Sequence, residues 1–266
     1  MRRIAIAEFI ASPEQRRLVQ EVLDSGRISE GPKVSQFEQA WASFVGSRHC
    51  VATNSGTSAL MVGLLALRHR LGLPRGTKAI TSALSFIATS NAIRHAGFAP
   101  VYVDVDPVRF HLLPDQVEEL LEGARPGEYG AIVPVHLMGY PAPMGRLLEL
   151  GRPVGSLGAL GIFSFYISHN IQGGEMGAVT TDDEALDDLI RRLKDQGRIY
   201  HTGEDLSRWF VHDLVGFNFK TTEFQAALAL PQVEAAEAIL QARRENVRGL
   251  NARLAHLQDW FQLPEY

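Results

Sequence analysis

The segment Asn54-Ser55-Gly56-Thr57-Ser58 places a glycine and several hydroxyl side chains where an apolar strand gives way to a helix. The first backbone N–H groups of a helix have no partner within it, and that helix end carries partial positive charge, so the segment can bind a phosphate group. Ser, Gly and Thr also cap helices in most proteins without binding a ligand. The segment alone therefore leaves a phosphate site and an ordinary helix cap both open.

Two further residues stand where strands are expected to end. Phe86 begins a helix beside the carboxyl edge of the sheet, where an aromatic ring can stack on a flat ligand, although core packing is the commoner role of a lone phenylalanine. His136 ends the apolar run AIVPVH and is more often a structural histidine than a ligand. No ligand spacing such as Cys-x-x-Cys or His-Glu-x-x-His occurs, so no metal site is expected.

The elements that must position these residues alternate between strand and helix. Strands are predicted over 49–53, 78–82, 100–105, 131–136, 162–166 and 178–181, and helices over 57–69, 87–96, 115–122, 144–150 and 183–196. One long helix is predicted over 222–257. This alternation predicts the α/β class, a three-layer sandwich with a mostly parallel sheet and ligands at the carboxyl ends of its strands.

The amino-acid composition bears on which kinds of molecule the chain can bind and on where in the cell it works. The 26 Lys and Arg against 30 Asp and Glu give a net charge of -4, which does not favour binding to nucleic acid or to an anionic membrane. No apolar run approaches the ~20 residues of a membrane helix. The single cysteine, Cys50, cannot form an internal disulfide, so a cytoplasmic location is expected.

Six segments, in this order, resemble the DegT/StrS family of nucleotide-sugar aminotransferases, which are pyridoxal phosphate enzymes of fold type I. The resemblance covers nearly the whole chain. The segments are NSGTSAL, SALSFIATSNAIRHAGFAPVYVDVDP, VPVHLMGYPAPM, VGSLGALGIFSFY, GGEMGAVTTDD and VGFNFKTTEFQAALAL.

The resemblance implies a cofactor, pyridoxal 5'-phosphate or pyridoxamine 5'-phosphate, and assigns residues to it. Gly56, Thr57 and Ser164 would contact its phosphate. Phe86 would stack on its ring, and Asn218 would reach the cofactor of a neighbouring subunit. The resemblance also implies a homodimer and a nucleotide-linked sugar as substrate.

One departure from the family pattern bears on the reaction. The family's Schiff-base lysine falls at His169 in FSFYISHN, and imidazole has no primary amine with which to bond the cofactor. One branch of the family makes this exchange, the dehydratases that remove the 3-hydroxyl of a nucleotide-linked 4-keto-6-deoxy sugar. In that branch pyridoxamine phosphate is held noncovalently and the histidine acts as the base, a role that suits imidazole near neutral pH.

Two other departures from the family pattern are an absent strand and a substituted glycine. After Leu150 the chain lacks the strand on which the family carries the aspartate that pairs with the cofactor ring, and Asp104 and Asp106 match a structural family position instead. Met176 stands where the family has glycine and is expected to crowd a loop near the cofactor.

Two domains are expected. Residues 1–221 form a large cofactor-binding domain, and residues 222–266 form a connector helix and the start of a truncated C-terminal domain. The missing parts are either absent from this copy of the sequence or truly lost.

The sequence therefore favours a pyridoxal or pyridoxamine phosphate enzyme that dehydrates a nucleotide-linked keto sugar with His169 as base. A sugar aminotransferase and a noncatalytic relative that serves as a binding subunit stay open. The presence of Gly56, Thr57 and Ser164 favours a relative that still binds the cofactor.

Overall fold

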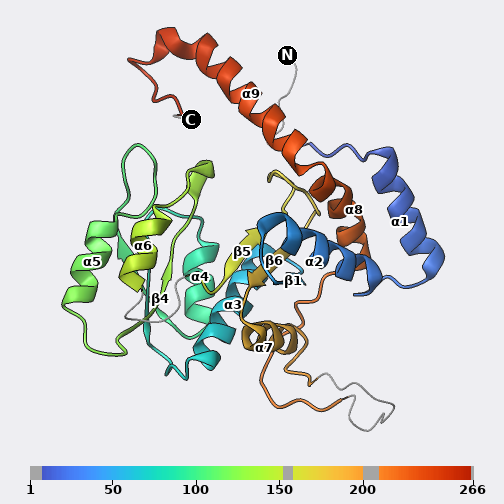
Figure 1. Ribbon diagram of the computed structural model, residues 1–266, viewed down its shortest axis with the longest axis horizontal. Coiled ribbons are helices and arrows are strands. Elements are labelled where there is room, and N and C mark those ends of the chain that lie inside the picture. The colour runs from blue at the N-terminus through green and yellow to red at the C-terminus, as the bar shows by residue number, and fades with distance from the viewer. Residues whose placement is uncertain (1–7, 152–157, 200–209, 265–266) are drawn as a thin grey trace.

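A computed structural model describes residues 8–151, 158–199 and 210–264 (Figure 1). Its helices are α1 (Pro13–Ser25), α2 (Pro32–Val45), α3 (Gly56–Arg70), α4 (Ala88–His95), α5 (Pro114–Glu122), α6 (Met144–Gly151), α7 (Glu184–Lys194), α8 (Glu223–Glu234) and α9 (Ala236–Leu254). Its strands are β1 (His49–Thr53), β2 (Lys78–Ser82), β3 (Ala99–Val103), β4 (Tyr129–Val133), β5 (Gly161–Ser164) and β6 (Gly177–Thr181).

The described strands form two sheets of three. In one sheet, with the order β3-β2-β4, both pairs of neighbours are parallel. In the other, with the order β1-β6-β5, both pairs are antiparallel, and Gly177 of β6 lies between Thr53 and Ser164. The ends of β1 and β5 therefore meet at Gly177, beside the start of α3.

Helices cover both faces of the strands, because alternate side chains of each strand point to opposite faces. Ala79 of β2 joins the core formed by α3, α4 and α7, whereas its neighbour Ile80 packs against α5 and α6. In the second sheet Val51 joins the α3 and α7 core, and Ala52 packs against α2 and α8. The strands thus form the middle of three layers (Figure 1).

The helix ends follow local sequence signals in some places and tertiary contacts in others. Ser12 and Gln15 form a reciprocal capping box at the start of α1, and Gly26 ends that helix with a φ of 66°. At the start of α2 the cap comes from α8 instead, since the Glu223 carboxylate accepts the N–H groups of Lys33 and Val34 at 2.9 Å each.

The predicted α/β class and the presence of a parallel sheet are confirmed, and most predicted elements are found within a few residues of their predicted ends. The single long helix predicted over 222–257 is wrong, because α8 ends at Glu234 and α9 begins at Ala236. Pro231 removes a backbone N–H inside α8, and Ala235 leaves the helical region with φ of -92° and ψ of 9°. The predicted domain boundary after residue 221 stays a prediction.

The described chain passes from α6 to β5 without an intervening strand. Within the described ranges β4 is therefore the last strand of one sheet, and β5 is the last strand of the other. The departure noted after Leu150 falls mostly on residues 152–157, which lie outside the described residues.

Candidate functional site

The start of α3 carries the predicted phosphate segment. The Ser55 side chain accepts the Ser58 N–H at 3.1 Å and so caps the helix. Gly56 and Thr57 are the first two residues of the helix, where backbone N–H groups have no partner within the helix. Thr57 is exposed and Gly56 is half-buried, so the helix start lies at the surface of the chain. The segment thus combines a satisfied cap with donors that remain available to an anion.

Ser164 packs directly against this helix start. A Cβ atom added to Gly56 would lie 2.5 Å from the Ser164 Cβ and 2.9 Å from its Oγ. A Cβ added to Gly177 would lie 2.3 Å from the Ser55 carbonyl oxygen and 2.7 Å from the Gly56 nitrogen. Both positions therefore require glycine, because a side chain at either one would push the helix start away from the strand ends.

Asn54 links this helix start to a distant segment. Its N–H donates to the Phe219 carbonyl at 2.8 Å, and its Oδ1 is buried without a hydrogen-bond partner in the described part of the chain. We call residues 54–57 with Ser164 the phosphate cradle. Its glycine, hydroxyl groups and free helix N–H groups fit a phosphate group.

Phe86 does not belong to the core. The residue lies two positions before α4, and 75% of its surface is exposed, so core packing does not explain it. Leu84 and Ile87 beside it are also exposed. His136 has the structural role predicted for it, since its Nδ1 accepts the Ala142 N–H at 2.9 Å, and burial lowers the pKa of its imidazole.

His169 lies in a turn five residues after Ser164. Its backbone N–H donates to the Tyr166 carbonyl at 2.8 Å, and its own carbonyl accepts the Arg243 Nη2 of α9 at 3.3 Å. Partial desolvation and the nearby Arg243 guanidinium together lower the pKa of the His169 imidazole. The ring is therefore predominantly neutral at pH 7 and can accept a proton.

Asn218 is exposed on a segment that runs beside the cradle. The Phe217 N–H donates to the Leu193 carbonyl at 2.7 Å, and the Phe219 N–H donates to the Lys194 carbonyl at 2.8 Å. The rings of Phe217 and Phe219 stack with centroids 4.6 Å apart. The structure therefore brings Gly56, Thr57, Ser164 and the Asn218 segment together.

Phe86 and His169 lie on other loops. Among the described residues, no hydrogen bond or ring contact joins either of them to the cradle. Their predicted places beside the ring of a cofactor stay predictions.

All four lysines of the sequence lie in the described residues, and each forms an ion pair with a carboxylate. An ammonium group held in this way has no lone pair with which to attack a carbonyl carbon. The pairs are Lys33 with Glu21, Lys78 with Glu128, Lys194 with Glu30 and Lys220 with Asp195.

The acids after β3 have structural roles, as predicted. The Asp106 Oδ1 accepts the N–H groups of Val108 at 2.9 Å and Arg109 at 2.7 Å, and these two bonds lower the pKa of the carboxyl. Asp104 accepts the Val105 N–H at 2.8 Å. The Met176 side chain is 1% exposed and packs in the core between α2 and α8, where it also lies against Gly173 of its own loop.

Sequence reasoning missed three features of the site. Gly177 could have been found from the glycine that precedes a buried strand, since a strand glycine often marks a close backbone approach. Arg243 and the buried pair of Lys194 and Glu38 had no local signal, because their contacts join residues far apart in the sequence.

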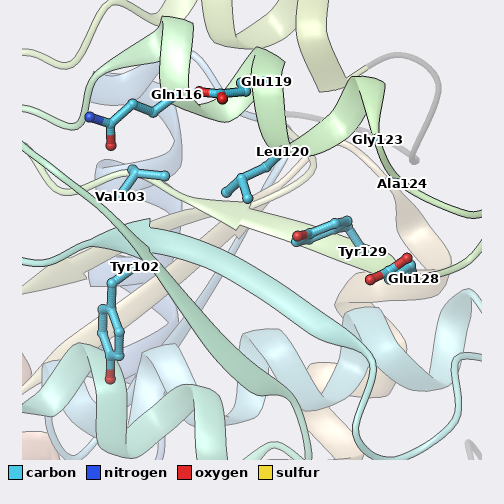
Figure 2. A pocket seen from close by; sticks show the side chains of 9 residues that line it. All are labelled: Tyr102, Val103, Gln116, Glu119, Leu120, Gly123, Ala124, Glu128 and Tyr129. Atoms are coloured by element: carbon cyan, nitrogen blue, oxygen red, sulfur yellow. The ribbon is translucent and has the colours of Figure 1, made fainter.

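A separate cavity of about 540 Å³ lies between α5 and strands β3 and β4. Figure 2 shows that Leu120, Val103 and Tyr129 line it together with the polar Gln116 and Glu119. None of the predicted site residues lines this cavity. In the described ranges no cluster of three metal-ligating side chains occurs, and no helix is long and apolar enough to span a membrane.

The chain is similar to known proteins over most of its length. Spore coat polysaccharide biosynthesis protein SpsC of Bacillus subtilis is 35% identical over 261 residues, which cover 89% of this chain and 65% of SpsC. GDP-perosamine synthase of Caulobacter vibrioides is 33% identical over 277 residues, which cover 96% of this chain and 71% of that enzyme. This alignment is longer than the 266 residues of the chain, so the synthase has residues without a counterpart here. The chain spans about two thirds of the length of these relatives.

Two solved structures share the fold. A GDP-4-keto-6-deoxymannose-3-dehydratase with a trapped PLP-glutamate geminal diamine superimposes with a TM-score of 0.85 over 95% of this chain and 73% of that one, at 22% identity. NtdA of Bacillus subtilis, with bound cofactor PMP, gives a TM-score of 0.77 at 29% identity over 94% of this chain and 59% of that one.

The model of the DegT/DnrJ/EryC1/StrS aminotransferase family matches residues 10–152 and 149–265, in two pieces that meet where the described chain passes from α6 to β5. The two pieces together cover nearly all of the sequence. The chain therefore belongs to the DegT/DnrJ/EryC1/StrS aminotransferase family.

Proposed function

We propose that this chain binds pyridoxamine or pyridoxal phosphate and acts on a nucleotide-linked keto sugar, with His169 as the base of a 3-dehydration. The observation that carries the proposal is the combination of His169 at the Schiff-base position with four lysines that are all ion-paired. The PMP bound to NtdA supports the cofactor, and the GDP-linked sugar named in GDP-perosamine synthase supports the class of substrate.

The cradle would hold the cofactor through its phosphate. The N–H groups of Gly56 and Thr57 would donate to phosphate oxygens, and the Ser164 hydroxyl would add a further donor. The exposed ring of Phe86 would cover one face of the cofactor ring. When bound, pyridoxamine phosphate supplies a primary amine for the keto group and a conjugated ring that accepts electrons.

His169 would move the proton. Its lowered pKa leaves the imidazole neutral at pH 7, so a ring nitrogen can take a proton and later return it to the departing hydroxyl. Above its pKa the imidazole is neutral and can accept a proton. This capacity is lost as the pH falls through that pKa. Loss of such a base typically slows a reaction about 10²-fold to 10⁴-fold.

A second candidate is aminotransfer with a cofactor that exchanges freely with solvent. The family name and GDP-perosamine synthase, a matched relative, favour it. The ion-paired lysines disfavour it, because no described amine is placed to displace a product from the cofactor.

We also propose that the chain acts as a homodimer. Large apolar side chains stand on the surface of the single chain, among them Phe86 and Ile87 before α4 and Val215 near Asn218, which is 91% exposed. A second copy would cover such residues. A cytoplasmic location is proposed from the single buried cysteine, Cys50.

The proposal is tested by absorbance titration of the protein with pyridoxal phosphate and pyridoxamine phosphate. The wild type is expected to bind pyridoxamine phosphate tightly and to form no Schiff base with pyridoxal phosphate. His169→Lys is expected to gain the visible absorbance band of a Schiff base, whereas Asn170→Lys, with its amine one residue away, is expected to gain none. Wild-type protein that binds neither cofactor would leave the chain a noncatalytic relative.

The reaction is tested with a nucleotide-linked 4-keto-6-deoxy sugar and pyridoxamine phosphate. Release of the 3-hydroxyl, detected by mass spectrometry, supports dehydration, and His169→Asn is expected to abolish it while cofactor affinity is kept. Formation of an amino sugar by the wild type would instead establish the second candidate.

A further inference from the structure

The outer edge of β1 is held by charged side chains where another strand would otherwise pair. The Ala52 N–H donates to the Glu38 Oε1 at 2.8 Å, and the Ala52 carbonyl accepts the Lys194 Nζ at 3.1 Å. Arg191 donates to the Cys50 carbonyl at 2.9 Å. Side chains of α2 and α7 therefore hold both backbone groups of Ala52, its N–H and its carbonyl.

Lys194 is the most deeply buried of these groups, with 1% of its side chain exposed. Its Nζ lies 3.0 Å from the Glu30 Oε2 and 3.6 Å from the Glu38 Oε1. A buried ion pair of this kind contributes little net stability compared with apolar residues of the same volume, because both charges lose their hydration. Stability alone is therefore a weak reason for a lysine at this position.

Two chains of hydrogen bonds connect Lys194 with the phosphate cradle. Through its side chain it holds Ala52, two residues before Asn54. Through its backbone carbonyl it accepts the Phe219 N–H, and the Phe219 carbonyl accepts the Asn54 N–H, each at 2.8 Å. The ammonium thus fixes the strand that leads into the cradle, while the backbone carbonyl of the same residue holds the segment that lies beside it.

We infer that Lys194 is a positioning residue for the phosphate cradle, which sets the place of residues 54–57 through the bond of its ammonium to the Ala52 carbonyl. The inference rests on the proposed function, because it takes the cradle to bind the cofactor phosphate. Lys194 touches neither the phosphate nor the reacting atoms in this role. A shift of the cradle would weaken the contacts to the phosphate and leave contacts to the cofactor ring in place.

The test compares pyridoxamine phosphate with pyridoxamine, which lacks the phosphate. The dissociation constant of pyridoxamine divided by that of pyridoxamine phosphate, both measured by equilibrium dialysis, gives the preference for the phosphate. This ratio reports the cradle alone. Lys194→Met is expected to reduce this ratio about 10-fold to 100-fold, the usual cost of losing a residue that orients a binding group. Lys194→Arg keeps a cation and is expected to recover most of it.

Lys78→Met is the matched control, since Lys78 is also ion-paired but lies at the opposite end of β2 from the carboxyl edge. It is expected to leave the ratio unchanged. If Lys194→Met does not fold, the double variant Lys194→Met with Glu38→Gln removes both buried charges and keeps an acceptor for the Ala52 N–H. The double variant is expected to lose the same preference for phosphate.

Two results would overturn the inference. One concerns Lys194 alone, and the other concerns the cradle and the proposed function. A folded Lys194 variant with a lower thermal midpoint and an unchanged ratio would show a role in stability only. A wild type that binds pyridoxamine as tightly as pyridoxamine phosphate would overturn the cradle itself, and the proposed function with it.

Discussion

At the scale of single residues, Arg243 lies beside His169, the proposed base. The guanidinium donates to the His169 carbonyl at 3.3 Å, and its charge adds to partial desolvation in lowering the pKa of the imidazole. Protonation of the ring would place a second positive charge beside the first, and the folded protein resists this. Desolvation and Arg243 together therefore keep the imidazole neutral at lower pH than a free imidazole, as the proposed base requires.

Arg243→Met is expected to raise the pKa of His169 towards the ordinary value of about 6.5, because the repulsion is removed while desolvation persists. The neutral fraction of the ring between pH 6 and 7 then falls. An NMR titration of the His169 ring measures the change without any substrate. Arg244→Met serves as control, and a pKa that stays constant in Arg243→Met would contradict the assignment.

Residues 54–58 stand out by their local pattern of glycine and hydroxyl side chains at a helix start, whereas Ser164 and His169 are assigned only by the family resemblance, and their roles stay predictions. The surroundings of those residues could not be predicted from local patterns. Arg243 lies 74 positions from His169, and Lys194 lies 142 positions from Ala52. Such contacts arise from the packing of whole helices and have no periodic signal in the chain.

At the scale of elements, the site depends on how closely α3 approaches the ends of β5 and β6. Gly56 and Gly177 permit this approach, because an added Cβ atom at either position would overlap Ser164 or the Ser55 carbonyl. Helix and strand identities followed from hydrophobic periodicity, so most elements were predicted. The break between α8 and α9 has one local signal, the proline at 231, and the long helical pattern on both sides of it obscures that signal.

Gly56→Ala is expected to destabilise the fold by about 1–3 kcal/mol, because the new methyl group would lie 2.5 Å from the Ser164 Cβ and force the helix away. Cofactor affinity is expected to fall with it. Gly249→Ala in α9 is the control, since no atom lies within 4 Å of its added Cβ and alanine favours a helix by about 0.5–1 kcal/mol. Urea unfolding gives both values, and equal effects at the two positions would contradict the close approach.

At the scale of the whole molecule, the described strands form two sheets where the α/β pattern predicted one. The family match divides at the same point, and the synthase alignment is longer than this chain. Local pattern could reveal this departure only as a helix followed directly by a glycine-rich loop. That β4 and β5 belong to different sheets depends on which strands pair with each other, and strand pairing joins segments that are far apart in the sequence.

The proposed homodimer places Asn218 of one copy at the cradle of the other, so each site would need residues from both chains. Gly56→Ala removes the cradle, and Asn218→Ala removes the contribution from the neighbour. In mixed dimers of these two variants, one site combines an intact cradle with an intact Asn218, and the other site lacks both. Random mixing after dissociation is therefore expected to restore about a quarter of the pyridoxamine phosphate sites, although each variant alone binds poorly.

Equilibrium dialysis counts the sites, and light scattering shows whether the chain is dimeric. A dimer that restores no sites would place Asn218 outside the neighbour's cradle, and a monomer would show that each chain holds a site of its own.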